Sequence, residues 1–519
     1  MATPLSTDST ATPSGSVPWL YLSTVALTLG GGLFYLYLAR VASSAEVGTV
    51  SLLAAVATVV VGVASLGLGN GFQHYLAYYR GKGDTAPARR LIRLGLAVAL
   101  LLPGATIAGV IVPAHEWSLL FFHSATYVPL LNLVAIFAGL SLAVAILQSL
   151  LVGLQRFVAY SAIVVTQSLV MYGGTVGLLL VFSGTEETVI VGWVIGTAIS
   201  ATLCLAVLLR QTGALLRTPD RGVPPSDPSG LLPELFRYSF PAYVAALIGT
   251  GAFYVDRLIV GVFLNLSAVG IYTYALLAAS AIAYLVNPFG TVLVPRLSAL
   301  FGRGDTKGLR SLVSVSTALV VLVYVPAALL LSAVAPLLLR LAVGPAYVSA
   351  GEPLTILLLA TAVAIPYTVL GSLAYGIRRT PVLMYASALA LLSNIALSII
   401  LIPRFGFAGA AVGNSATAWA PLIVLYLGLR GSGLIRVEWR PVLAIWAASV
   451  VMAVATGAIL QALGAGLAGA AVGLAVGIPL FLVILRWTRG VTTEMSDIIA
   501  ISAPRWKPLF GPLLRWLTR

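Results

Sequence analysis

Two adjacent charged residues, Asp256 and Arg257, lie in the outer third of an apolar stretch and are the strongest candidates for chemistry in this sequence. A charge at the centre of a bilayer costs about 2.5–3.5 kcal/mol on insertion scales, so such residues are retained for function by default. An arginine at this depth can instead extend its guanidinium to the outer headgroups. An aspartate is too short to do so, and we therefore expect Asp256 to face protein or water.

A third charge, Arg40, ends the first apolar stretch of the chain. The internal repeat described below has an offset of 219 residues here, which places Tyr37 opposite Asp256. Arg40 then lies about one helical turn from the depth of Asp256. We predict that Arg40 and Asp256 face a cavity from opposite helical bundles and form a contact that opens during function. The alternative is that Arg40 extends into the outer headgroups.

Uncharged polar side chains supply the remaining candidates for contact with a ligand. Tyr35 and Tyr254 end a Gly-x-Gly-x-Phe-Tyr pattern that occurs twice, and Asn70 and Asn287 are amides within apolar stretches. Such amides often hydrogen-bond between helices instead of binding a ligand. The three histidines lack the spacing of metal ligands, and no nucleophile or phosphate-binding loop stands out. We expect no metal, no cofactor and no catalytic residues.

The elements that carry these residues are membrane-spanning helices. The chain is 60% hydrophobic and only 8% charged, whereas soluble domains carry roughly a quarter charged residues. Apolar runs recur near the ~20 residues that a helix needs to cross a bilayer. We count fourteen of them, and none shows the alternation of a transmembrane barrel. The sequence therefore predicts an all-α polytopic membrane protein.

The net charge of +14 has a topological explanation. If both chain ends are placed in the cytoplasm, all but four of the 29 Lys and Arg fall on the inner side. This is the positive-inside bias, and it predicts a cytoplasmic or inner membrane protein with both termini inside. It leaves no reason to invoke nucleic acid. The exceptions are Arg40, Arg257, Arg340 and Arg404.

The chain contains a tandem duplication. Residues 81–92 and 302–313 share six of twelve positions, and three further motifs recur in the same order at separations of 217–223 residues. These are the Gly-x-Gly pattern above, residues 153–156 against 376–379, and the Gly-xxx-Gly pairs at 192 and 409. Six spans per copy is an even number, so both copies cross in the same sense. We expect a pseudo-twofold axis along the membrane normal.

This duplication defines the predicted domains. We expect a disordered tail, a six-helix bundle, a proline-rich cytoplasmic linker, a second six-helix bundle, two extra helices and a basic, aromatic tail on the inner leaflet. Their ranges are 1–17, 18–210, 211–237, 238–430, 431–487 and 488–519.

The sequence resembles the multidrug/oligosaccharidyl-lipid/polysaccharide exporter superfamily, and within it the lipid-linked oligosaccharide flippases. The resemblance covers the two six-span repeats and the extra spans, and includes Pro295–Ser298 at the end of span eight and Gly153–Arg156 at the end of span four. It implies a central cavity lined by spans one, two, seven and eight that works by alternating access. Related multidrug antiporters often carry an acidic residue in span one, where this sequence has none.

The resemblance therefore favours a flippase that moves a polyprenyl- or dolichyl-linked glycan from the inner to the outer leaflet. Membrane lipids, a coupling ion (H⁺ or Na⁺) and other glycan-assembly membrane proteins are the expected partners. A multidrug or cation antiporter of the same superfamily is the first alternative. A polytopic glycan polymerase or ligase is the second, but its site would need a sizeable outer loop. The longest outer loop, about residues 113–127, is too short to form one alone.

Overall fold

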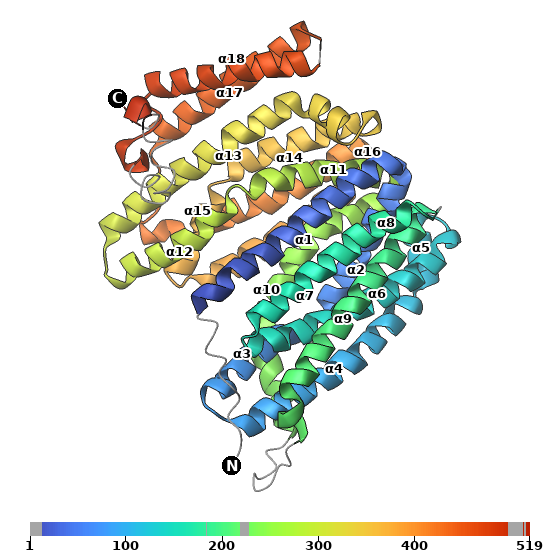
Figure 1. The fold of residues 1–519 in the computed structure, drawn as a ribbon. Coiled ribbons are helices and arrows are strands. Elements are labelled where there is room, and N and C mark those ends of the chain that lie inside the picture. The colour runs from blue at the N-terminus through green and yellow to red at the C-terminus, as the bar shows by residue number, and fades with distance from the viewer. Residues whose placement is uncertain are drawn as a thin grey trace. The chain divides into compact units, whose positions relative to one another are not determined.

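The computed structural model describes residues 13–182, 184–217, 228–464, 466–496, 512 and 515–518. All regular secondary structure in these residues is helical (Figure 1). Most of the predicted N-terminal tail, the centre of the predicted linker and most of the predicted C-terminal tail lie outside them. The chain divides by its internal contacts into two compact units, unit 1 (Met1–Ser267) and unit 2 (Ala268–Arg519).

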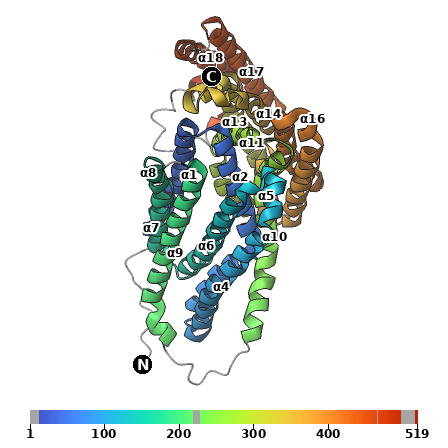
Figure 2. The ribbon, with the colours of Figure 1, turned by 90° about the vertical axis from the view of Figure 1, so that its right-hand side faces the viewer.

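Unit 1 contains ten α-helices and two short helical segments among its described residues. They are α1 (Pro13–Val41), α2 (Ser44–Ala64), α3 (Leu68–Gly81), α4 (Thr85–Ile111), α5 (Ala114–Phe122), η1 (Ala125–Tyr127), α6 (Val128–Gly153), α7 (Phe157–Ser168), η2 (Leu169–Gly174), α8 (Thr175–Leu179), α9 (Thr185–Arg217) and α10 (Pro228–Phe263). Helix α6 packs against both α4 and α9, and the three run side by side (Figure 2). The expected outer loop at 113–127 is occupied by α5 and η1.

Unit 2 begins near the start of α11, because the boundary between the units lies between Ser267 and Ala268. Its elements are α11 (Leu266–Ala283), α12 (Asn287–Gly302), α13 (Thr306–Ala342), η3 (Pro345–Ala350), α14 (Gly351–Ala364), α15 (Tyr367–Gly376), α16 (Thr380–Leu429), η4 (Arg430–Ser432), α17 (Trp439–Ala462) and α18 (Leu467–Trp487). Helices α17 and α18 pair with each other, and α17 packs on α13 (Figure 1). The two extra spans are thus attached to the unit through α13.

Thirteen segments of the described chain are long and apolar enough to cross a membrane. One of them, Thr380–Ser432, has 53 residues, far more than one crossing needs. Gly406 interrupts it with φ 57° and ψ −140°, so α16 comprises two helices that fold back on each other. Counting these halves separately gives the fourteen spans that the sequence predicts.

Glycines allow the two halves of α16 to pack closely, and the same arrangement occurs in unit 1. A Cβ on Gly413 would lie 2.3 Å from the Ser398 hydroxyl of the opposite half. A Cβ on Gly196 would lie 2.7 Å from the Cα of Met171 in η2. Both positions come from the repeated Gly-xxx-Gly pair. The sequence repeat therefore marks equivalent helix contacts within each copy.

The loops of the repeat adopt matching backbone conformations as well. Gly83 and Gly304 both have positive φ (76° and 68°) in the turns before α4 and α13. Gln155 and Arg378, which occupy equivalent places in the Gly153–Arg156 motif and its copy, both adopt left-handed conformations (58° and 60°). A left-handed residue other than glycine is uncommon, so its recurrence at the equivalent position supports a true duplication.

A break in the backbone separates α2, which is the second candidate span, from α3. Leu66 and Gly67 carry positive φ values of 47° and 69° at this break. A corresponding break lies between α11, which is the candidate span Leu266–Ala283, and α12, just before Pro288. The first break depends on glycine and the second lies beside a proline, which explains why no common motif marks them.

Candidate functional site

Arg257 on α10 is a buried arginine of unit 1. It is only 6% exposed, and its Nε has no hydrogen-bond partner among the described residues. The guanidinium carbon lies 5.3 Å from the ring centre of Phe253 and 5.1 Å from that of Tyr254. These cation–π contacts compensate part of the lost hydration, but they leave a donor without an acceptor. A buried donor of this kind is suited to an anionic ligand.

Phenol groups from two other elements lie beside this arginine. Tyr35 of α1 is within electrostatic range of Arg257 and Tyr254. Tyr172 of η2 is within range of Tyr35 and Tyr254. Its ring also packs 5.6 Å from the ring of Phe34. Three helical elements therefore place three hydroxyls and a cation in one region of unit 1. We call this set, Tyr35, Tyr172, Tyr254 and Arg257, the Arg257 cluster.

Helix α10 is held in place by close packing along α2. A Cβ on Gly261 would lie 2.9 Å from a methyl group of Leu52, so glycine is needed for the approach. At the other end of the contact, the Tyr243 hydroxyl donates a 2.8 Å hydrogen bond to the Val63 carbonyl. That carbonyl lies directly before the break between α2 and α3. Tyr243 thus provides a partner to backbone near the break and fixes the register of α10.

Tyr172 is positioned by an irregular helix and two glycines. It lies in η2, a π-helical segment, and such segments are frequent at functional sites. A Cβ on Gly30 would lie 3.0 Å from the Tyr172 ring, and one on Gly31 would lie 3.2 Å from its hydroxyl. Ser168 also donates a 2.8 Å hydrogen bond to the Ala26 carbonyl of α1. Gly30 and Gly31 therefore let α1 approach Tyr172 closely.

The predicted residues fall into two groups. The structure brings Tyr35, Tyr254 and Arg257 together. Asp256 is fully buried, and its carboxylate accepts a 2.9 Å hydrogen bond from the Arg257 backbone N–H. That Asp256 faces a cavity opposite Arg40 stays a prediction. Arg40 is exposed at the end of α1, and Tyr37 is half-buried on the same helix.

Neither of the two predicted amides, Asn70 and Asn287, is placed in the Arg257 cluster by the described side chains. Asn70 is exposed on α3, next to the break. Asn287 begins α12, and its side chain lies outside the described residues. Other intramembrane amides connect helices. Gln167 accepts hydrogen bonds from Gln148 (3.4 Å) and Ser200 (3.1 Å), which joins α7 to α6 and α9.

Sequence reasoning missed Tyr172 and the two rings that flank the cluster, Phe34 and Phe253. Phe34 and Phe253 were present in the repeated pattern, directly before the two tyrosines that were selected. Tyr172 carries no such signal, because a π-helical segment has no distinct sequence pattern. The pair Gly173 and Gly174 beside it was the one available hint of irregular backbone.

Solved structures share this fold. The inward-closed lipid II flippase MurJ is 14% identical, with a TM-score of 0.68 over 90% of this chain and 98% of that one. An inward-facing multidrug resistance MATE family transporter of the MOP superfamily is also 14% identical, with a TM-score of 0.63 over 81% and 98%. A Vibrio cholerae MATE transporter, VcmN, gives 15% identity and a TM-score of 0.53 over 81% and 98%. The chain thus shares the fold of these transporters, and its candidate spans make it a multi-pass membrane protein.

The sequence places the chain more narrowly. Residues 16–301, more than half of the chain, match the polysaccharide biosynthesis protein family. The chain belongs to that family, which confirms the predicted resemblance. No curated protein matches the chain significantly.

Proposed function

We propose that the protein is a flippase that carries a lipid-linked oligosaccharide or polysaccharide precursor from the inner to the outer leaflet by alternating access. The observation that carries the proposal is Arg257, a buried cation with a donor that has no partner among the described residues. The headgroup of such a substrate contains phosphate, which arginine binds through paired, charge-assisted hydrogen bonds. The membrane is the cell membrane, and both termini are cytoplasmic.

The aromatic residues of the Arg257 cluster suit the sugar part of the same substrate. Sugars present apolar ring faces and several hydroxyls, and the cluster offers aromatic rings and three phenol hydroxyls. The polysaccharide biosynthesis family and the fold shared with a lipid II flippase support this substrate class. Transport without chemical conversion of the glycan is part of the proposal.

The test is translocation in vesicles that contain the purified protein and a fluorescent lipid-linked oligosaccharide. Arg257→Ala should lower the initial rate about tenfold or more, because a hydrogen bond between charged groups contributes about 1.5–3 kcal/mol. Arg257→Lys should retain part of the rate, since it keeps the charge but not the paired geometry. Arg340→Ala, an exposed arginine on α13, is the matched control and should leave the rate unchanged.

Two results would contradict the proposal. The first is an unaltered rate in Arg257→Ala at matched protein content. The second is transport of small organic cations driven by a proton or sodium gradient, with no movement of the lipid-linked glycan. That second result would establish the antiporter alternative.

A further inference from the structure

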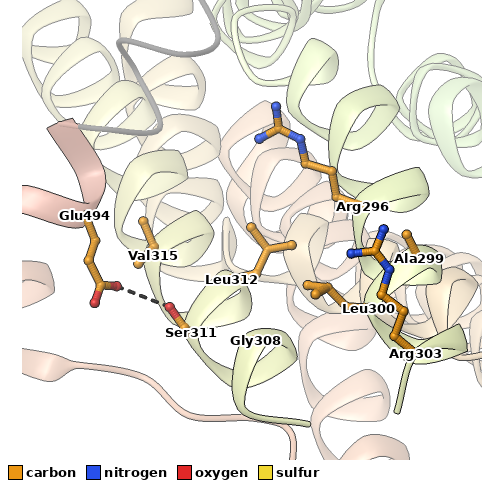
Figure 3. Close-up of a pocket in the computed structure, with 9 residues that line it drawn as sticks. All are labelled: Arg296, Ala299, Leu300, Arg303, Gly308, Ser311, Leu312, Val315 and Glu494. Atoms are coloured by element: carbon orange, nitrogen blue, oxygen red, sulfur yellow. Dashed lines mark hydrogen bonds between the residues drawn. The ribbon is translucent and has the colours of Figure 1, made fainter. Parts of the chain in front are cut away.

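Unit 2 contains a cavity that the transport proposal does not use. It has a volume of ≈ 500 Å³ and lies among the end of α12, the first turns of α13 and the turn of chain that follows α18 (Figure 3). Its polar lining residues are Arg296, Arg303, Ser311 and Glu494. The charge pattern of the sequence assigns this end of α12 and α13 to the cytoplasmic side.

Two arginines form one side of the cavity. Arg296 lies on α12 and Arg303 is the residue that caps its C-terminus, seven positions later, so two helical turns place them on the same side of the helix. Both are exposed, and no hydrogen bond from either guanidinium is found within the described part of the chain. Exposed arginines on one face near the inner leaflet attract phosphate groups of lipids. They form the cationic side of the site.

A carboxylate forms the other side. Figure 3 shows Glu494 separated from both arginines, with Leu312 between them. Its Oε2 accepts a 3.2 Å hydrogen bond from the Ser311 hydroxyl. The turn that carries Glu494 is anchored, because the neighbouring Met495 is fully buried and its backbone N–H bonds to the Thr492 hydroxyl at 3.3 Å. The backbone that carries this carboxylate is therefore anchored beside the cavity.

The remaining lining is apolar and consists of Ala299, Leu300, Leu312 and Val315. A free phosphate would gain nothing from these side chains, whereas the glycerol and first acyl carbons of a lipid would bury apolar surface against them. Asp305 lies nearby, but its carboxylate already accepts the Gly308 N–H at 2.8 Å as the cap of α13. The cavity thus combines a cationic side, an anionic side and an apolar wall.

We propose that this cavity binds an inner-leaflet phospholipid whose headgroup carries both a phosphate and an amine, as phosphatidylethanolamine does. The phosphate pairs with Arg296 and Arg303, and the ammonium pairs with Glu494 and the Ser311 hydroxyl. An anionic headgroup without an amine would meet the same arginines but would be repelled by Glu494. The site selects the headgroup by its two opposite charges, and does so whatever substrate the protein transports.

The test is lipid retention by the purified full chain, measured by native mass spectrometry after exchange into phosphatidylethanolamine or phosphatidylglycerol. The unaltered protein should retain phosphatidylethanolamine about tenfold more strongly. Arg296→Ala with Arg303→Ala should remove this retention. Glu494→Gln should abolish the preference between the two lipids while keeping phosphate binding. Arg436→Ala, an exposed arginine outside the cavity lining, is the control and should behave as the unaltered protein.

Three outcomes would overturn the proposal. One is equal retention of both lipids by the unaltered protein, and another is full retention by the double arginine variant. The third is displacement of the lipid by millimolar phosphoethanolamine or inorganic phosphate, which would identify a site for a soluble anion. Because the readout is retained lipid, a failure here leaves the transport proposal untouched.

Discussion

Burial of Arg257 costs the fold free energy of desolvation. Its guanidinium is desolvated and lies over the rings of Phe253 and Tyr254. Replacing a buried charge by an apolar side chain of similar volume is often neutral or stabilising. Activity can require residues that lower stability, and our proposal assigns Arg257 to this class. Replacing Arg257 should therefore lower transport without lowering the stability of the fold.

Arg257→Met provides that separation. We expect the thermal midpoint of the purified protein to stay the same or rise, because methionine fills a similar volume without the desolvation cost. Transport of the lipid-linked glycan should fall to background. Arg404→Met, at an exposed arginine of α16, should change neither quantity. A large drop in the midpoint for Arg257→Met would assign the arginine to the fold instead.

A second prediction concerns the pair Arg40 and Asp256. We predict that they meet during the transport cycle, since repeat-related positions place them about one turn apart in depth. Arg40→Ala should then reduce transport while membrane insertion is kept. Asp256→Asn should change the balance between inward- and outward-open states, measured as accessibility of engineered cysteines from each side. Normal transport by Arg40→Ala at matched expression would show that Arg40 only extends into the headgroups.

At the scale of the element, the break between α2 and α3 is the feature most closely tied to one residue. Gly67 has φ 69°, and a Cβ there would lie 2.4 Å from the Cβ of Tyr243. The glycine is needed both for its backbone conformation and for the close approach of α10. In α10, Tyr243 packs against the break and hydrogen-bonds to Val63. The break and the position of α10 are therefore coupled.

Gly67→Ala tests this coupling, with Gly83→Ala as its control. Both glycines have positive φ, but a Cβ on Gly83 would meet no atom within 4 Å. The control should show only the backbone cost of about 1–2 kcal/mol. Gly67→Ala should lose about 1–3 kcal/mol more through the overlap with Tyr243. Thermal midpoints measured side by side give the comparison, and equal shifts would show that packing at Tyr243 is not what requires the glycine.

At the scale of the whole molecule, the sequence predicted the helices well and their breaks poorly. Span number and type follow from apolar length, and the duplication follows from glycine and turn motifs that the structure shows in equivalent contacts. The break at Gly67 and the π-helical segment around Tyr172 depend on local backbone geometry, which composition does not report. The Arg257 cluster was predicted only where a charge or a repeated motif marked it.

The sequence also did not predict which helices α10 packs against. The repeat assigns it to the second copy, yet its contacts place it in unit 1, against α2, α3 and α5. Duplication fixes which helices are equivalent, but side-chain packing decides which neighbours a helix has. The boundary predicted at residues 211–237 stays a prediction about the repeat, whereas the internal contacts change at Ser267.

The orientation of the chain is the last prediction, and it rests on the distribution of 29 Lys and Arg in the sequence. Single cysteines in a Cys204→Ser background report it, because Cys204 is the only native cysteine and is buried. Lys307→Cys and Arg430→Cys lie on the predicted inner side, whereas Glu187→Cys and Glu352→Cys lie on the outer side. All four residues are exposed, so burial does not limit their reaction. In intact cells an impermeant thiol reagent should label the two outer positions and spare the two inner ones until the membrane is opened. Labelling of Lys307→Cys or Arg430→Cys from outside would reverse the orientation, and it would also place the lipid cavity of unit 2 in the outer leaflet.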